Sequence, residues 1–234
     1  MAIWQTGWKG NKSLINGDPE WFDGIWGQFI IPKERWLNGA YAWIGCLTEQ
    51  QKFMQVGIFP QWPNGTINGS KYPGEWIIAY STDNLWYFLQ PYNDVRVRPG
   101  DSVILAIMKN PYGTNWQIWA VNTPAITQDP PEKVGGTMFA YDAGKKFHIL
   151  NLKVVFEGYT GPASETDLLK PGWITIEPVR VRRADINQQI PIPMLGDFQP
   201  QDIPAYAVGK YVEPPSTISK NRVDEKFSFG YIPL

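Results

Sequence analysis

The side chains best suited to nucleophilic catalysis or metal binding are scarce in this chain of 234 residues. Cys46 is the single cysteine and His148 the single histidine. A single cysteine cannot form a disulfide within the chain. A single cysteine and a single histidine are also too few for a zinc site built from these residues, and the sequence offers no set of residues that indicates a histidine-based catalytic triad. We therefore expect no metal and no cofactor. Cys46 stands in an apolar run, which is typical of a buried, unreactive thiol.

Charge and hydropathy argue against two further classes of partner. The chain has 22 acidic and 21 basic residues, so no basic surface for nucleic acid or an anionic membrane is expected. No apolar stretch approaches the roughly 18 residues of a membrane span, and the first residues lack a secretory signal pattern. We expect synthesis in the cytoplasm, with release or assembly into a particle left open.

Strands must position the remaining polar candidates. The 21 prolines and 22 glycines separate short runs rich in valine, isoleucine and aromatic residues, and no helical periodicity persists. Without helical crossovers, such runs favour a two-sheet antiparallel β-sandwich of jelly-roll type. The predicted strands are residues 27–31, 41–47, 53–59, 76–80, 102–109, 116–122, 146–156 and 172–181.

The composition divides the chain into three parts. Residues 1–24 are predicted to form an aromatic-rich N-terminal arm, residues 25–183 the β-sandwich domain, and residues 184–234 a proline-rich, extended C-terminal arm. The C-terminal segment has too many aromatic residues for a typical disordered tail. Either arm would brace its own domain or tie copies of the chain together.

Six short motifs occur in an order that resembles the eqolisins, the glutamic peptidases. They are Gln28-Phe29-Ile30-Ile31-Pro32, Trp43-Ile44-Gly45-Cys46, Met54-Gln55-Val56-Gly57-Ile58, Trp76-Ile77-Ile78, Pro99-Gly100-Asp101 and Leu152-Lys153-Val154-Val155-Phe156-Glu157. Each motif is short, but their shared order and similar spacing cover residues 25–181. The resemblance implies a concanavalin A-like β-sandwich.

The resemblance also implies a catalytic pair, which this sequence breaks. In eqolisins a glutamate activates water and a glutamine stabilises the oxyanion. Gln55 matches the glutamine, but Lys153 stands at the position of the glutamate, and a protonated ammonium has no lone pair with which to accept a proton. Leu47 and Ile78 stand at two further acidic positions of the family. Glu157 follows on the same strand face, about 13 Å further along at about 3.3 Å per residue.

Aromatic side chains provide a second candidate surface, because tryptophan and tyrosine stack on sugar rings and on extended peptides. Trp43 and Trp76 belong to strands and are expected to fill the core, while Trp62, Trp86 and Tyr87 follow turn sequences and are expected to be exposed. The predicted binding residues are Gln55, Lys153, Trp43, Trp62, Trp76, Trp86 and Tyr87.

Three functions remain open from the sequence. The first is a non-catalytic eqolisin-like module that binds carbohydrate or an extended peptide. The second is a structural protein of a virus-like particle, filament or surface layer, which contacts copies of itself through the terminal arms. The third is an acid peptidase that uses Gln55 with Glu157, which requires a different strand register from the one that we infer.

Overall fold

A computed structural model describes residues 4–13, 21–33, 40–60, 76–82, 90–110, 115–123, 135–142, 144–158, 173–184, 192–193, 196–202, 218–224 and 226–231. Its strands are β1 (Trp4–Ser13), β2 (Trp21–Ile30), β3 (Ala40–Thr48), β4 (Phe53–Pro60), β5 (Trp76–Thr82), β6 (Gln90–Val97), β7 (Ser102–Lys109), β8 (Asn115–Thr123), β9 (Gly135–Asp142), β10 (Phe147–Gly158), β11 (Trp173–Arg183), β12 (Ile192–Pro193), β13 (Gly196–Asp202), β14 (Ile218–Val223) and β15 (Lys226–Tyr231). Among these residues no helix is long and apolar enough to cross a membrane.

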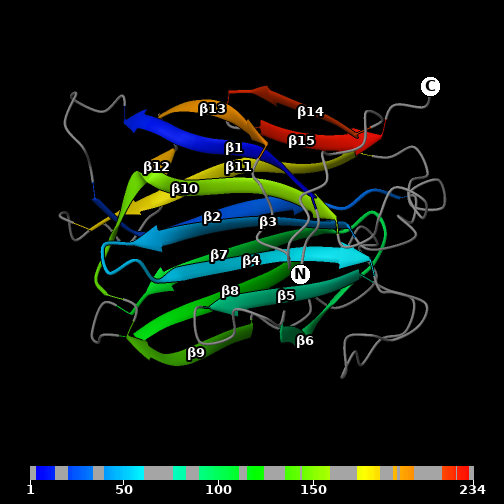
Figure 1. Ribbon diagram of the computed structural model, residues 1–234. Coiled ribbons are helices and arrows are strands. Elements are labelled where there is room, and N and C mark those ends of the chain that lie inside the picture. Colours follow the sequence, from blue (N-terminus) through cyan, green and yellow to red (C-terminus); the bar gives the residue numbers. More distant parts are fainter. Residues whose placement is uncertain are drawn as a thin grey trace.

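The strands form two antiparallel layers (Figure 1). The first sheet has the order β13-β1-β10-β3-β4-β5-β6, and the second has the order β14-β15-β11-β2-β7-β8-β9, with β12 paired to β11. A short pairing of β10 with β2, at Phe147 and Phe22, connects the layers at one end. The predicted all-β, two-sheet antiparallel sandwich is confirmed.

The main core lies between the two sheets and follows from the alternation of side chains along each strand. On β3, Ile44 and Cys46 point inward and are fully buried, as are Ile25 and Phe29 on β2. Burial raises the pKa of the Cys46 thiol, so the thiol stays protonated and unreactive. The neighbouring residues of β3 therefore point to the opposite face of the first sheet.

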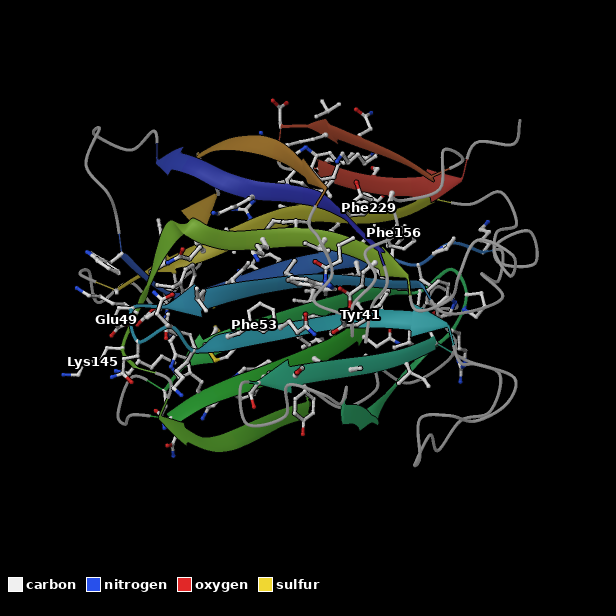
Figure 2. All side chains as sticks on the ribbon, viewed as in Figure 1. Tyr41, Glu49, Phe53, Lys145, Phe156 and Phe229 are labelled. Carbon is white, nitrogen blue, oxygen red and sulfur yellow. The ribbon has the colours of Figure 1, made fainter. Side chains whose placement is uncertain are left out.

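The segments expected to form terminal arms supply strands to both sheets. Trp8 of β1 is 4% exposed, and its ring centroid lies 5.4 Å from that of Phe227 and 5.2 Å from that of Phe229, both on β15. Phe229 also stacks on Phe156 of β10 at 5.4 Å, and Figure 2 shows these two rings side by side. Aromatic side chains from both ends of the chain thus close one end of the core.

The Pro-Gly-Asp motif is a structural turn. Gly100 has φ of 88°, which glycine adopts readily and other residues rarely do. The Asp101 carboxylate accepts hydrogen bonds from the backbone N–H of Arg98 at 2.8 Å and from the Asn122 amide at 2.9 Å. The Asp101 carbonyl accepts a third from the Ile31 N–H at 2.9 Å. The aspartate therefore fixes the entry into β7.

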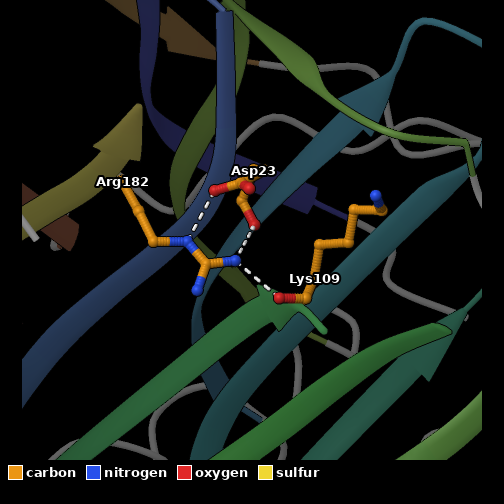
Figure 3. A network of polar contacts seen from close by, with 3 residues as sticks. All are labelled: Asp23, Lys109 and Arg182. Carbon is orange, nitrogen blue, oxygen red and sulfur yellow. Dashed lines mark hydrogen bonds and ion pairs between the residues drawn. The ribbon is translucent and has the colours of Figure 1, made fainter. Parts of the chain in front are cut away.

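Arg182 joins three strands of the second sheet (Figure 3). Its Nε donates to Asp23 Oδ1 at 2.6 Å, and its Nη2 donates to the Lys109 carbonyl at 2.5 Å. Burial raises the pKa of the Asp23 carboxyl, although Arg182 and Lys109 act in the opposite direction. The contacts tie β11 to β2 and β7.

The turn between β3 and β4 is anchored from outside the hairpin. The Glu49 carboxylate accepts hydrogen bonds from the backbone N–H of Lys145 at 2.7 Å and of Lys146 at 2.9 Å. Glu49 and Lys145 lie beside each other at one end of the molecule (Figure 2). The hairpin that carries Gln55 is therefore fixed to the segment that leads into β10.

Candidate functional site

Gln55 and Lys153 belong to one row of residues across the first sheet. On β3, Gly45 pairs with Gln55 of β4 on one side and with Lys153 of β10 on the other. Lys153 in turn pairs with Lys9 of β1. At a strand spacing of about 4.8 Å, the backbones of Gln55 and Lys153 are about 10 Å apart. We call Gln55, Gly45, Lys153 and Lys9 the Gln55 row.

The middle of the row has no side chain of its own and is occupied by Trp43. A Cβ atom added to Gly45 would lie 2.6 Å from the Met54 carbonyl oxygen, 2.9 Å from Trp43 Cζ3 and 3.1 Å from Gln55 Cβ. Cβ atoms do not tolerate such approaches, so only glycine fits at this position. The benzo edge of the Trp43 indole therefore lies against Gly45, beside Gln55.

A small hydrophobic cluster surrounds Trp43 on the face of the first sheet turned away from the main core, which we call the Gln55 face. The Trp43 ring meets Phe53 edge-on at 5.7 Å, and the Tyr41 hydroxyl donates to the Ala79 carbonyl at 2.9 Å. Gln55 itself is 8% exposed. The cluster contains Tyr41, Trp43, Ile77, Ala79 and Val155, all at most 5% exposed, with Phe53 packed against them.

The lysine end of the row is the more accessible part, since Lys9 and Lys153 are both half-buried. Burial lowers the pKa of Lys153, the positive charge of Lys9 lowers it further, and the carboxylate of Glu157 opposes both effects. Within the described part of the chain, neither lysine forms an ion pair with a carboxylate. Among the described residues, the two facing ammonium groups thus have little compensation from carboxylates.

Glu157 lies on the same strand face as Lys153 but in a different row. It pairs with Tyr41 on β3 and with Gln5 on β1, whereas Lys153 pairs with Gly45. Its carboxylate is 3% exposed and accepts a hydrogen bond from Gln5 Nε2 at 2.5 Å. Burial, and to a smaller extent Glu157, raise the pKa of Tyr41. The structure does not bring Glu157 beside Gln55.

The other sequence candidates are distributed over different places. Trp76 is 4% exposed and packs in the main core, on the opposite side of the first sheet from Gln55, as does Ile78. Leu47, two residues after Gly45, shares the Gln55 face. Trp62, Trp86 and Tyr87 lie outside the described residues.

No three histidine, cysteine or acidic side chains come together in a possible metal site among the residues that the structure describes. The described polar side chains of the Gln55 face include the ammonium groups of Lys9 and Lys153, the amide of Gln55, the hydroxyl of Ser81 beside it and the carboxylate of Glu157. The lysine ammonium groups donate only, so they favour anions and repel cations. The arrangement therefore suits recognition of a polar ligand better than metal chemistry.

Sequence reasoning missed two members of the row. Lys9 lies in a segment with little apolar alternation, so the sequence contains no signal that β1 pairs with β10. Gly45 was noticed only as part of a motif, although a glycine inside a strand is itself a signal of close approach by another group. Here that group is the indole of Trp43.

Comparison with known proteins supports the fold. No family model matches the sequence, and no curated protein matches it. The structure is similar to the crystal structure of scytalido-glutamic peptidase with a transition state analog inhibitor, with a TM-score of 0.56, 12% sequence identity, and coverage of 99% of this chain and 98% of that chain. The predicted likeness to the eqolisins is thus confirmed for the fold. At this identity the similarity does not extend to activity.

Proposed function

We propose that this chain is a non-catalytic, eqolisin-like β-sandwich that binds an extended peptide at the Gln55 row, whose accessible part is Lys9 and Lys153. The observation that carries the proposal is the Gln55 row, in which Lys153 and Lys9 face Gln55 across Gly45. A peptidase of glutamic type needs a carboxylate beside the glutamine to take a proton from water. The row offers two ammonium groups in its place.

The position of Glu157 supports the same proposal. A general base must come within about 3 Å of the water it activates, directly or through one further water. Glu157 lies four residues from Lys153 along β10, which corresponds to about 13 Å of strand. It is hydrogen-bonded to Gln5, and the Trp43 ring lies against Gly45 beside Gln55. A water shared by Gln55 and Glu157 has no place in this arrangement.

An extended peptide is the ligand class favoured by the fold. The similar solved structure is a glutamic peptidase crystallised with a transition state analog inhibitor, and a sheet face of this kind presents side chains in regular rows. Carbohydrate binding is the alternative ligand class. Its proposed aromatic platform, Trp62, Trp86 and Tyr87, lies outside the described residues, so no contact supports it.

The first experiment separates binding from catalysis. Wild type, Gln55→Ala and Lys153→Glu are incubated with an unfolded protein substrate between about pH 2 and 7, where a carboxylate base titrates. We expect no cleavage by wild type. Cleavage by wild type that disappears in Gln55→Ala would show a peptidase and overturn the proposal. Activity that appears only in Lys153→Glu would support it, because the remaining geometry would then lack only the base.

A second experiment tests binding itself. Arrays of unstructured peptides and of glycans are probed with wild type, Gln55→Ala and Lys145→Gln, the last being a control because Lys145 is exposed and contacts Glu49 in the β3–β4 turn, outside the row. We expect saturable binding to peptides that weakens in Gln55→Ala and is unchanged in Lys145→Gln. Binding to glycans alone would replace the peptide with a carbohydrate ligand. No saturable binding to either array would refute the proposal.

A further inference from the structure

The facing lysines of the Gln55 row form an unusual cross-strand pair. Lys9 of β1 lies directly opposite Lys153 of β10. Side chains in such positions have Cβ atoms about 4.5–5.5 Å apart, and like charges there destabilise a sheet. Both side chains are half-buried, so water screens their repulsion only in part. A negatively charged ligand bound between the two ammonium groups would relieve their repulsion, so such a pair is expected at an anion-binding site.

Further hydrogen-bond donors lie on the same face. Gln55 offers an amide NH2 on the other side of Gly45, and its side chain has no hydrogen bond to any described residue. The indole N–H of Trp43 is buried and lacks a hydrogen-bond partner among the described residues. Because Trp43 Cζ3 contacts Gly45, the nitrogen on the opposite edge of the indole is turned away from that glycine. A buried donor left unpaired costs about 1–3 kcal/mol.

The carboxylate of Glu157 on the Gln55 face is already engaged. Glu157 accepts a hydrogen bond from Gln5 and pairs across the sheet with Tyr41, four residues along β10 from Lys153. It raises the pKa of Lys153 only as the smallest of three effects. Among the residues whose side chains the structure describes, no carboxylate forms an ion pair with either lysine, so we take their positive charge to be the feature that a ligand recognises.

We infer that Lys9 and Lys153, with the amide of Gln55, hold a carboxylate of the bound peptide. The inference rests on the proposed peptide-binding function and names the group that is recognised. A carboxylate has two oxygens that accept several hydrogen bonds, which suits ammonium and amide donors approaching from different strands. The carboxylate is supplied either by the C-terminus of the peptide or by an acidic side chain.

Acetate alone tests the anion site without a peptide. It is titrated into the protein while the backbone amide resonances of Lys9, Lys153 and Gln55 are followed by NMR, with Lys145 as the exposed reference. We expect saturable shifts at the three residues of the row that are lost in the double variant Lys9→Gln/Lys153→Gln. Absence of such shifts in a folded protein would overturn the inference whatever the peptide results.

Labelled peptides then distinguish the source of the carboxylate. Three versions of a short serine-valine peptide are compared by fluorescence anisotropy: one with a free C-terminus, one amidated, and one amidated with a central glutamate. We expect a carboxylate-bearing version to bind at least about tenfold more tightly than the neutral one, and Lys153→Gln to abolish that difference while Lys145→Gln keeps it.

Each outcome has a separate meaning. Preference for the free C-terminus or for the glutamate supports the inference and identifies the source. Equal binding of all three peptides, unaffected by Lys153→Gln, refutes the carboxylate contact but keeps the peptide-binding function. Acetate shifts without binding of any of the three peptides keep the anion site and refute the peptide function on which this inference rests.

Discussion

Replacing Lys153 by glutamine should stabilise the free protein, which is an unusual expectation for a half-buried residue. Glutamine retains most of the aliphatic length and a polar end but removes the charge. The change relieves the repulsion from Lys9 and the desolvation of a buried ammonium, the two effects that lower the Lys153 pKa. Neither lysine has a carboxylate partner among the described residues whose loss would offset this gain.

The magnitude follows from the strand register. Directly opposed side chains on neighbouring antiparallel strands interact by about 0.2–1 kcal/mol. We expect Lys153→Gln to raise the free energy of unfolding at pH 7 by about 0.5–1 kcal/mol, and Lys9→Gln by somewhat less. Because the repulsion is relieved only once, the double variant should gain less than the two single gains together. The shortfall measures the coupling between the lysines.

The assay is urea unfolding followed by tryptophan fluorescence, for wild type, both single variants, the double variant and Lys145→Gln as an exposed control. The pH dependence provides a second readout. The folded pKa of Lys153 lies below its ordinary value of 10.5, so between these two values the unfolded state binds more protons and stability rises with pH. That rise should be missing in Lys153→Gln. If Lys153→Gln instead lowered the free energy of unfolding at pH 7 by about 1 kcal/mol or more, the reasoning would be refuted. A loss of this size is the usual cost of a lost hydrogen bond, so it would show that the ammonium is paired and stabilising.

Three further changes test other parts of the structure by the same unfolding assay. Gly45→Ala should cost about 1–3 kcal/mol, because its new carbon would meet the backbone at 2.6 Å, whereas Gly24→Ala meets only side-chain atoms and should cost less. Trp8→Ala should lower the free energy of unfolding by about 3–5 kcal/mol, whereas Val223→Ala should change it very little because Val223 is 59% exposed. Equal effects of the two changes would show that β1 does not belong to the core. The raised pKa of Asp23 means that wild-type stability falls as pH rises from 3.8 through the folded pKa, and Asp23→Asn should remove that fall.

The sequence predicted the central strands well because their side chains follow a regular pattern. The expected strands at residues 53–59 and 102–109 agree with β4 and β7. Both segments are rich in apolar residues, and each strand has a neighbouring strand on both of its edges. The sequence did not predict β1, β6, β9 or β12 to β15 as strands. The segment of β1 contains Lys9, Lys12 and two glycines, so its pairing with β10 depends on partners about 150 residues away in sequence.

The candidate site was predicted in the same uneven way. The motif order identified Gln55 and Lys153, and the structure places them on either side of Gly45. Trp76 was expected to fill the core although it was also named among the binding residues, and the alternation of β5 turns it into the main core, while Ile77 and Ala79 face the Gln55 side. A shift of one residue in a strand exchanges the two faces, and the motif alone does not set that register.

The sequence by itself determined the chemical inventory and the class of fold. It holds one cysteine, one histidine and a lysine at the key strand position, and its strand and turn pattern favours a β-sandwich. The tertiary structure alone decided that Lys9 faces Lys153 and that Trp43 lies against Gly45. Lys9 and Lys153 come from strands far apart in the chain, and hydrogen-bond register between strands is a property of the assembled sheet that no local pattern specifies. Trp43 and Gly45 share β3, and there the packing around the indole decides that the ring lies over the glycine.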